Sequence, residues 1–88
     1  VLVLAIPDWG VTPFGAKSGR DTAQIARELD AFNAAAAEIA RNSSVRFVDT
    51  SAVSRAHGAE WVAEDGLHPS AALYAAWAEA AEIALLGP

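Results

Sequence analysis

The sequence contains no cysteine among its 88 residues. Disulfide bonds, thiolate metal ligands and cysteine nucleophiles are therefore excluded, although no compartment is identified. Basic residues are also scarce: six Lys and Arg stand against eleven Asp and Glu, and the formal net charge is −5. Because the cations are scattered and nucleic acid demands a basic face, we expect no nucleic-acid partner.

Long apolar runs are missing as well. No uninterrupted apolar stretch approaches the roughly 20 residues that a transmembrane helix requires, so we expect no membrane span. The sequence is 53% hydrophobic and 19% charged, a composition typical of globular domains rather than of disordered chains. Its length suits one small domain or part of a larger one.

The order of the apolar segments predicts an α/β fold. Val1–Ile6 is a continuous apolar run, typical of a strand buried on both faces of a parallel sheet. Residues 45–49 form a second strand, and residues 21–41 form a helix between the two strands. This helix carries apolar residues at helical spacing, namely Ile25, Leu29, Phe32, Ala36, Ile39 and Ala40. The three segments together predict a βαβ unit with parallel strands.

Two long loops are expected at the carboxyl ends of these strands, over residues 7–19 and 50–69. A final helix follows the second loop, with Ser70 as its expected N-cap and with Tyr74 and Trp77 in the core. Ligand sites of open parallel sheets lie beyond the carboxyl ends of the strands. Both loops are therefore expected to border the functional site.

The predicted sheet has too few strands to be stable alone. A strand as apolar as Val1–Ile6 needs neighbours, and a two-stranded sheet is marginal in water. The sequence also begins inside this strand. We therefore expect residues 1–88 to be the C-terminal part of a single larger α/β domain, or a chain that needs a partner.

Asp65 and His68 are the main candidates for catalysis. With two residues between them, a tight turn at Gly66 brings the carboxylate to Nδ1 of the imidazole and leaves Nε2 free as a base. Pro69 stiffens the exit from this turn. The alternative is that Asp65 caps a loop and His68 is a solvated residue before a helix, because a D-x-x-H match is short.

The segment DGLHPS, followed by an amphipathic C-terminal helix, resembles the last sequence block of the SGNH hydrolases, also called the GDSL esterase/lipase family. The segments IPDWGVTPFG and FVDTSAVSR resemble the regions after the penultimate and last strands of bacterial members. The order of elements matches over essentially all 88 residues. This resemblance implies a flavodoxin-like three-layer α/β/α fold, of which the sequence holds only the last two parallel strands and the C-terminal helices.

The same resemblance implies a function. It assigns the chain to a serine esterase that cleaves carboxylic esters without a metal or an organic cofactor, with a small-molecule ester as substrate. By position, His68 is the general base of a Ser-His-Asp triad and Asp65 orients it. The loop over residues 7–19 then walls the substrate cleft through Asp8, Trp9, Thr12 and Phe14. Trp9 and Phe14 are equally well explained as packing this loop onto the domain.

The sequence departs from the family pattern in one respect. It contains no Gly-Asp-Ser block for the nucleophile and no Gly or Asn blocks for the oxyanion hole. None of the six serines present has the setting of a nucleophile: Ser18, Ser43, Ser44, Ser51, Ser54 and Ser70. We therefore expect these residues alone to be inactive and to depend on a missing N-terminal part or a partner chain.

Three other interpretations remain open: a phosphate-binding P-loop, a non-catalytic fragment and a metal site. The segment from Gly15 to Ser18 partly matches a phosphate-binding P-loop, but Ala16 separates the glycine from Lys17 and Pro13 removes a backbone donor. The second interpretation is a non-catalytic α/β fragment that folds with a partner or as an oligomer.

A metal site is the other ligand-binding possibility. His57, Asp65 and His68 have side chains that suit zinc, without a recognised ligand spacing.

Overall fold

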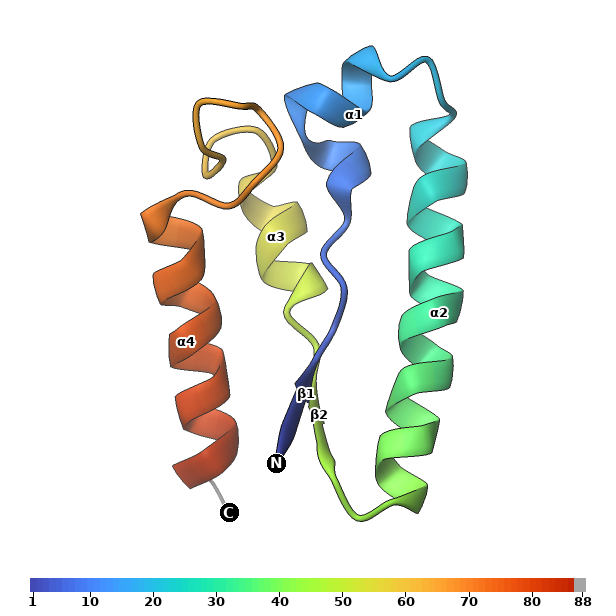
Figure 1. The fold of residues 1–88 in the computed structure, drawn as a ribbon, viewed down its shortest axis with the longest axis vertical. Coiled ribbons are helices and arrows are strands. Elements are labelled where there is room, and N and C mark those ends of the chain that lie inside the picture. The colour runs from blue at the N-terminus through green and yellow to red at the C-terminus, as the bar shows by residue number, and fades with distance from the viewer. Residues whose placement is uncertain (87–88) are drawn as a thin grey trace.

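Two parallel strands flanked by two long helices form the framework of the molecule, which the computed structural model describes over residues 1–86 (Figure 1). Strand β1 (Leu2–Leu4) pairs with β2 (Arg46–Val48) in parallel. Helix α2 (Thr22–Asn42) connects the strands and lies on one side of them, and α4 (Ala71–Leu86) lies on the other side. The predicted α/β organisation and parallel pairing are confirmed, but each strand is shorter than predicted.

Local capping explains the limits of α2. The Asp21 carboxylate accepts hydrogen bonds from the backbone N–H groups of Ala23 and Gln24, which otherwise lack partners at a helix start. At the other end, the N–H of Ser43 donates to the carbonyls of the last turn, and Ser44 adopts a positive φ of 58°. The chain reverses there and enters β2.

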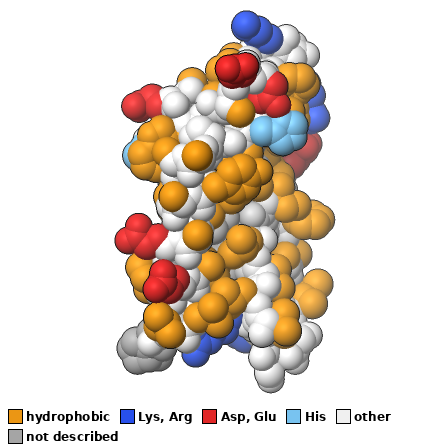
Figure 2. Space-filling view, turned by 60° about the vertical axis from the view of Figure 1, so that its left-hand side comes forward, with side chains coloured by type: hydrophobic (Ala, Val, Ile, Leu, Met, Phe, Trp, Pro, Cys, Tyr) orange, Lys and Arg blue, Asp and Glu red, His pale blue; other side chains and the backbone are white. Residues whose placement is uncertain are grey.

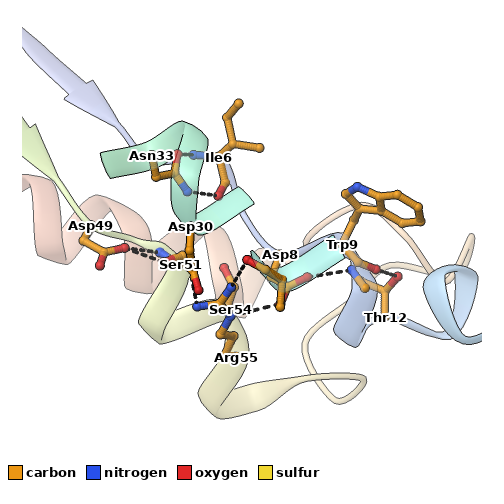
Figure 3. Close-up of polar contacts among 12 residues, drawn as sticks. Ile6, Asp8, Trp9, Thr12, Asp30, Asn33, Asp49, Ser51, Ser54 and Arg55 are labelled. Atoms are coloured by element: carbon orange, nitrogen blue, oxygen red, sulfur yellow. Dashed lines mark hydrogen bonds and ion pairs between the residues drawn. The ribbon is translucent and has the colours of Figure 1, made fainter. Parts of the chain in front are cut away.

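The exit from β1 is held by a side chain of α2. The amide of Asn33 accepts a hydrogen bond from the Ile6 N–H and donates one to the Ile6 carbonyl, each at 2.9 Å (Figure 3). Asn33 is buried, so the two bonds satisfy backbone groups for which no strand partner remains. The amide therefore fixes the point where the chain leaves the sheet.

Both predicted loops contain short helices, so the prediction that they are irregular was wrong. The first loop holds a 3₁₀ turn, η1 (Trp9–Val11), and helix α1 (Pro13–Lys17). The Thr12 hydroxyl caps α1 by accepting from the Gly15 N–H, and proline is favourable at the first helical position. The second loop begins with α3 (Ser51–His57).

Large apolar side chains remain exposed on several elements. Tyr74 was predicted to lie in the core but is 54% exposed, and two apolar residues at helical spacing in α2, Phe32 (58%) and Ile39 (67%), are exposed as well. Val3 and Leu4 of β1 are also partly open, at 36% and 43%. Figure 2, which brings the α4 side forward, shows hydrophobic side chains spread over this face. The molecule is only 16 Å deep along its shortest axis, so the residues described have no further layer to cover these groups.

The helices are also short or polar relative to a lipid bilayer. Among residues 1–86, no helix combines the length and apolar character needed to cross a membrane.

Candidate functional site

Asp65 and His68 meet in a tight turn before α4. Oδ1 of Asp65 accepts hydrogen bonds from the backbone N–H groups of Leu67 and His68, both at 2.9 Å. Its other oxygen, Oδ2, lies in hydrogen-bond contact with Nδ1 of His68. Gly66 supports the turn with a positive φ of 72°, which a residue without a Cβ adopts at little cost. The structure thus has the side-chain contact that the spacing predicts.

The two ends of this turn are tied together by the backbone. The N–H of Ala63 donates to the His68 carbonyl at 2.7 Å, and Val62 and Pro69 form an antiparallel bridge. The N–H of Ser70 donates to the Trp61 carbonyl at 2.9 Å. Because the ladder closes around Asp65 and His68, their relative position depends on several backbone bonds rather than on one side-chain contact.

The contact determines which imidazole nitrogen is free. An ionised carboxylate only accepts hydrogen bonds, so Nδ1 of the neutral ring carries the proton and Nε2 does not. The side chain of His68 is 69% exposed, so Nε2 is open to an approaching group. The hydrogen bond from His68, followed by the backbone bonds from Leu67 and His68, lowers the pKa of Asp65 to about 2. The His68 ring thus has a free Nε2 and a neighbouring carboxylate that is ionised above about pH 2.

The lowered pKa of Asp65 can be tested by following its titration and the stability of the fold as the pH changes. In the folded protein, we expect the Asp65 carboxyl carbon to titrate near pH 2 in an NMR pH series, against 3.8 for an ordinary aspartate. Because the folded pKa is the lower one, the ionised carboxylate stabilises the fold above pH 3.8, and this contribution is lost as the pH falls toward 2. In the His68→Ala variant the titration should move toward 3.8. A wild-type midpoint near 3.8 would contradict the contact.

The loops that follow the two strands touch each other beside this turn. The N–H of Phe14 in α1 donates to the Gly66 carbonyl at 3.0 Å. A Cβ on Gly66 would come within 3.3 Å of the Pro13 side chain, so the two backbones approach closely. Asp65 and His68 therefore border the loop after β1, as the topology of a parallel sheet predicts.

A buried ion pair holds both loops and α2 together (Figure 3). The side chain of Asp8 is 2% exposed and accepts hydrogen bonds from Nε of Arg55 and from the Gly10 N–H, both at 2.9 Å. A second nitrogen of Arg55 lies 2.9 Å from the Asp30 carboxylate on α2. The hydrogen bonds to Asp8 and then to Asp30 raise the pKa of Arg55. Asp8 was predicted to wall the cleft, and its carboxylate bonds to Arg55.

The importance of Arg55 could not be inferred from the sequence. It is 47 residues from Asp8, and no motif connects the two. The only signal was the position of Asp8 directly after the first strand, where functional or anchoring acids commonly stand in parallel sheets.

Asp8→Ala is predicted to lower the free energy of unfolding by about 2–3 kcal/mol, because the substitution leaves a partly buried guanidinium without its main partner. Asp30→Ala is the matched control: this carboxylate is 58% exposed, so its loss should cost less than about 1 kcal/mol. Urea denaturation of the folded protein measures both values. Equal costs for the two variants would contradict the assignment of Asp8 as the anchoring partner.

An apolar cavity of about 200 Å³ lies beside His68. It extends between η1, α3 and α4, and both Trp9 and Thr12 contribute to its lining, as does Asp8. Phe14 does not line this cavity. It is 50% exposed and packs edge-to-face on Trp9, with 6.1 Å between ring centroids. Three of the four predicted cleft residues thus meet at the cavity, and the fourth supports one of them.

The structure does not assemble the other ligand sites considered from the sequence. His57 stacks on Trp61, with the two ring centroids 3.4 Å apart. No group of three or more His, Asp or Glu side chains in residues 1–86 is placed to hold a metal ion.

The P-loop interpretation is contradicted by the local geometry. Gly15 lies inside α1, where a Cβ would be 2.4 Å from the Trp9 carbonyl oxygen. This glycine therefore serves close packing of the backbone. The Ser18 hydroxyl donates to the Gly15 carbonyl and so ends α1, while the long helix α2 begins only at Thr22. No helix N-terminus follows Lys17 and Ser18 at the distance that a phosphate cradle requires.

The serines have structural partners. The Ser51 hydroxyl donates to Asp49, and the Ser54 hydroxyl donates to the Thr50 carbonyl. Ser70 accepts a hydrogen bond from the Leu73 N–H at 3.4 Å, as expected of an N-cap. No hydrogen bond between a serine hydroxyl and the His68 ring is found in the part of the chain that the structure describes.

Comparison with known proteins identifies a family. The model of the GDSL-like Lipase/Acylhydrolase family matches residues 1–76. This range includes the loop after β1, the Asp65–His68 turn and the first part of α4. No curated protein and no solved structure matches the chain significantly.

Proposed function

The chain belongs to the GDSL-like lipase/acylhydrolase family, and on that premise we propose that it supplies His68 and Asp65 to the catalytic triad of a serine hydrolase that cleaves carboxylic esters. The observation that carries this proposal is the contact between the Asp65 carboxylate and Nδ1 of a histidine whose other face is open. A solvated loop histidine needs no ionised partner, and the Asp65 carboxylate would not need to be held by three hydrogen bonds, two to backbone N–H groups and one to the His68 ring.

The proposed reaction uses protein side chains only. A serine outside residues 1–88 attacks the ester carbonyl, and Nε2 of His68 takes the proton from its hydroxyl. The imidazolium formed is stabilised by the Asp65 carboxylate and gives the proton to the leaving alcohol oxygen. His68 then takes a proton from a water molecule as the water oxygen attacks the acyl-enzyme. When the bond from the acyl carbon to the serine oxygen breaks, His68 gives this proton to the serine oxygen, which releases the carboxylic acid and the free serine.

The same proposal includes the remainder of the fold. We place residues 1–88 at the C-terminal end of a three-layer α/β/α domain, with further strands added beside β1 by an N-terminal part or a partner chain. Support comes from β1, which pairs only with β2 among residues 1–86 and so has one edge without a partner strand, because an open strand edge is a site for strand pairing. Without the nucleophile and oxyanion hole, residues 1–88 alone are inactive.

Fluorophosphonate labelling tests the proposal. The complete protein should hydrolyse 4-nitrophenyl acetate and lose this activity when one serine outside residues 1–88 is labelled, whereas residues 1–88 alone should show neither reaction. A complete, folded protein that is neither labelled nor active would favour the non-catalytic α/β interpretation.

A further inference from the structure

We propose that the apolar cavity beside His68 binds an unbranched alkyl chain of the ester. The preferred substrates are then esters in which the acyl or the alcohol arm is an alkyl chain of more than two carbons. This inference rests on the proposed function, because it assigns the cavity to a substrate of the same site. It is carried by the chemistry of the lining, by the position of the cavity relative to His68, and by its volume.

Both oxygens of the carboxylate that lines the cavity already have partners. Oδ2 of Asp8 is bonded to Arg55 and Oδ1 accepts from the Gly10 N–H. Asp8 therefore has no oxygen left without a partner for a cationic group of a ligand. A ligand ammonium would have to displace a guanidinium that bridges Asp8 and Asp30.

The hydroxyls that line the cavity are likewise engaged. The Thr12 hydroxyl donates to the Trp9 carbonyl at 2.6 Å and accepts from the Gly15 N–H. The Ser54 hydroxyl donates to the Thr50 carbonyl and accepts from Nε1 of Trp77, both at 3.2 Å. A sugar or another polar ligand group would lose its bonds to water here without gaining replacements, which is costly. A hydrocarbon chain loses none.

The cavity is also unsuited to a segment of polypeptide backbone. Each residue of such a segment would bring an N–H and a carbonyl group that require partners, and the side-chain hydroxyls and the carboxylate around the cavity already have theirs. An alkyl chain requires no partner and gains from burial of its surface.

The lining of the cavity includes both exposed and buried residues. His68 is largely exposed, whereas Leu73 (5%) and Ser54 (4%) are buried. We therefore place the ester group of the bound chain at His68 and its methyl end against Leu73. This orientation is the one that ester cleavage requires.

The volume limits the length of the chain. A dry apolar cavity of about 150 Å³ holds one benzene molecule in another protein. By that measure, the 200 Å³ found here has room for roughly six to eight carbon atoms.

Two ester series on the complete protein test the assignment and show which arm enters the cavity. One series lengthens the acyl group in 4-nitrophenyl acetate, butyrate, hexanoate and dodecanoate, and the other lengthens the alcohol in ethyl to dodecyl acetates. In the series whose arm enters the cavity, kcat/KM should rise about fourfold per added CH₂ group, on the order of 10³-fold in total, and level off beyond roughly eight carbons. Two flat series would overturn the assignment.

Filling the cavity supplies the variant. Val11 and Val62 line the cavity from the two loops. Val11→Phe should lower the ratio of kcat/KM for the favoured six-carbon ester to kcat/KM for the two-carbon ester at least tenfold. Val62→Phe fills the cavity from the other loop and serves as the second variant if Val11→Phe does not fold. Val53→Phe makes the same change on α3, outside the lining, and should leave the length preference intact. An unchanged preference in both folded cavity variants would overturn the inference.

A binding measurement separates this inference from the proposed function. 2-Octanone has a hexyl arm and cannot be hydrolysed, so methyl NMR spectra of the complete protein should show shifts at Val11 and Leu73 with 2-octanone and not with acetone. Absence of these shifts overturns the cavity assignment even if acetates are hydrolysed. Shifts without any ester hydrolysis would support the alkyl site and contradict the proposed function.

Discussion

Replacing His68 with alanine in the complete protein is expected to lower kcat for ester hydrolysis by about 10⁴-fold or more, because no other group takes the proton from the nucleophile. KM should change little, since the imidazole accepts the proton of the serine hydroxyl and does not hold the bound ester. The fold should be unaffected: the side chain is 69% exposed, and its loss creates no cavity. Steady-state kinetics and a thermal melt measure the two effects.

His57→Ala is the matched control for this experiment. His57 is the other histidine of the chain and stacks on Trp61, so its loss should reduce stability slightly and leave kcat within about twofold. Unchanged hydrolysis in a folded His68→Ala protein would end the triad assignment. Equal losses in both histidine variants would point to a general disturbance of the loop.

The Asp65–His68 turn could be predicted from the sequence because its determinants are local. The acid and the histidine are three residues apart, and Gly66 between them permits the positive φ that the turn requires. The N-caps Asp21 and Ser70 are predictable for the same reason, since each bonds to backbone groups only two or three residues away.

The anchoring of the site could not be predicted, because it depends on residues distant in sequence. Asp8 and Arg55 meet only after both strands are paired, and Ser54 meets Trp77 across 23 residues. The position of Asp8 after a strand predicts a cleft residue, but it does not predict the bond to Arg55. Its partner was hidden in α3, a helix whose small and polar residues have weak helical signals.

Burial was the least predictable property. Helical periodicity identifies apolar faces, but it does not say which of two adjacent faces another element covers. Ile25 and Ala40 of α2 are buried against the rest of the chain, while Phe32 and Ile39, on the neighbouring stripe, are exposed. The sequence pattern reflects the surroundings for which it was selected, and we propose that those surroundings include more of the domain than residues 1–88.

The second large effect is expected for Asp65→Asn, which changes charge and hydrogen bonding with almost no change in shape. Oδ1 of Asp65 accepts from two backbone N–H groups, so the oxygen of an asparagine amide should take that position. The amide NH₂ group then faces Nδ1 of His68 and donates to it. Nδ1 becomes the acceptor, the proton moves to Nε2, and the nitrogen that must act as base is blocked.

We therefore expect Asp65→Asn to lower kcat by between about 10² and 10⁴-fold, with little change in KM. The ¹⁵N spectrum of His68 gives a readout that a merely structural role would not move: the ring proton should reside on Nδ1 in the wild type and on Nε2 in the variant. Asp49→Asn is the control, because Asp49 bonds to Ser51 and not to His68. A folded Asp65→Asn protein that stays active and keeps the Nδ1–H tautomer would show that His68 is oriented by something other than Asp65. Loss of activity with the tautomer unchanged would instead leave the negative charge, rather than ring orientation, as the contribution of Asp65.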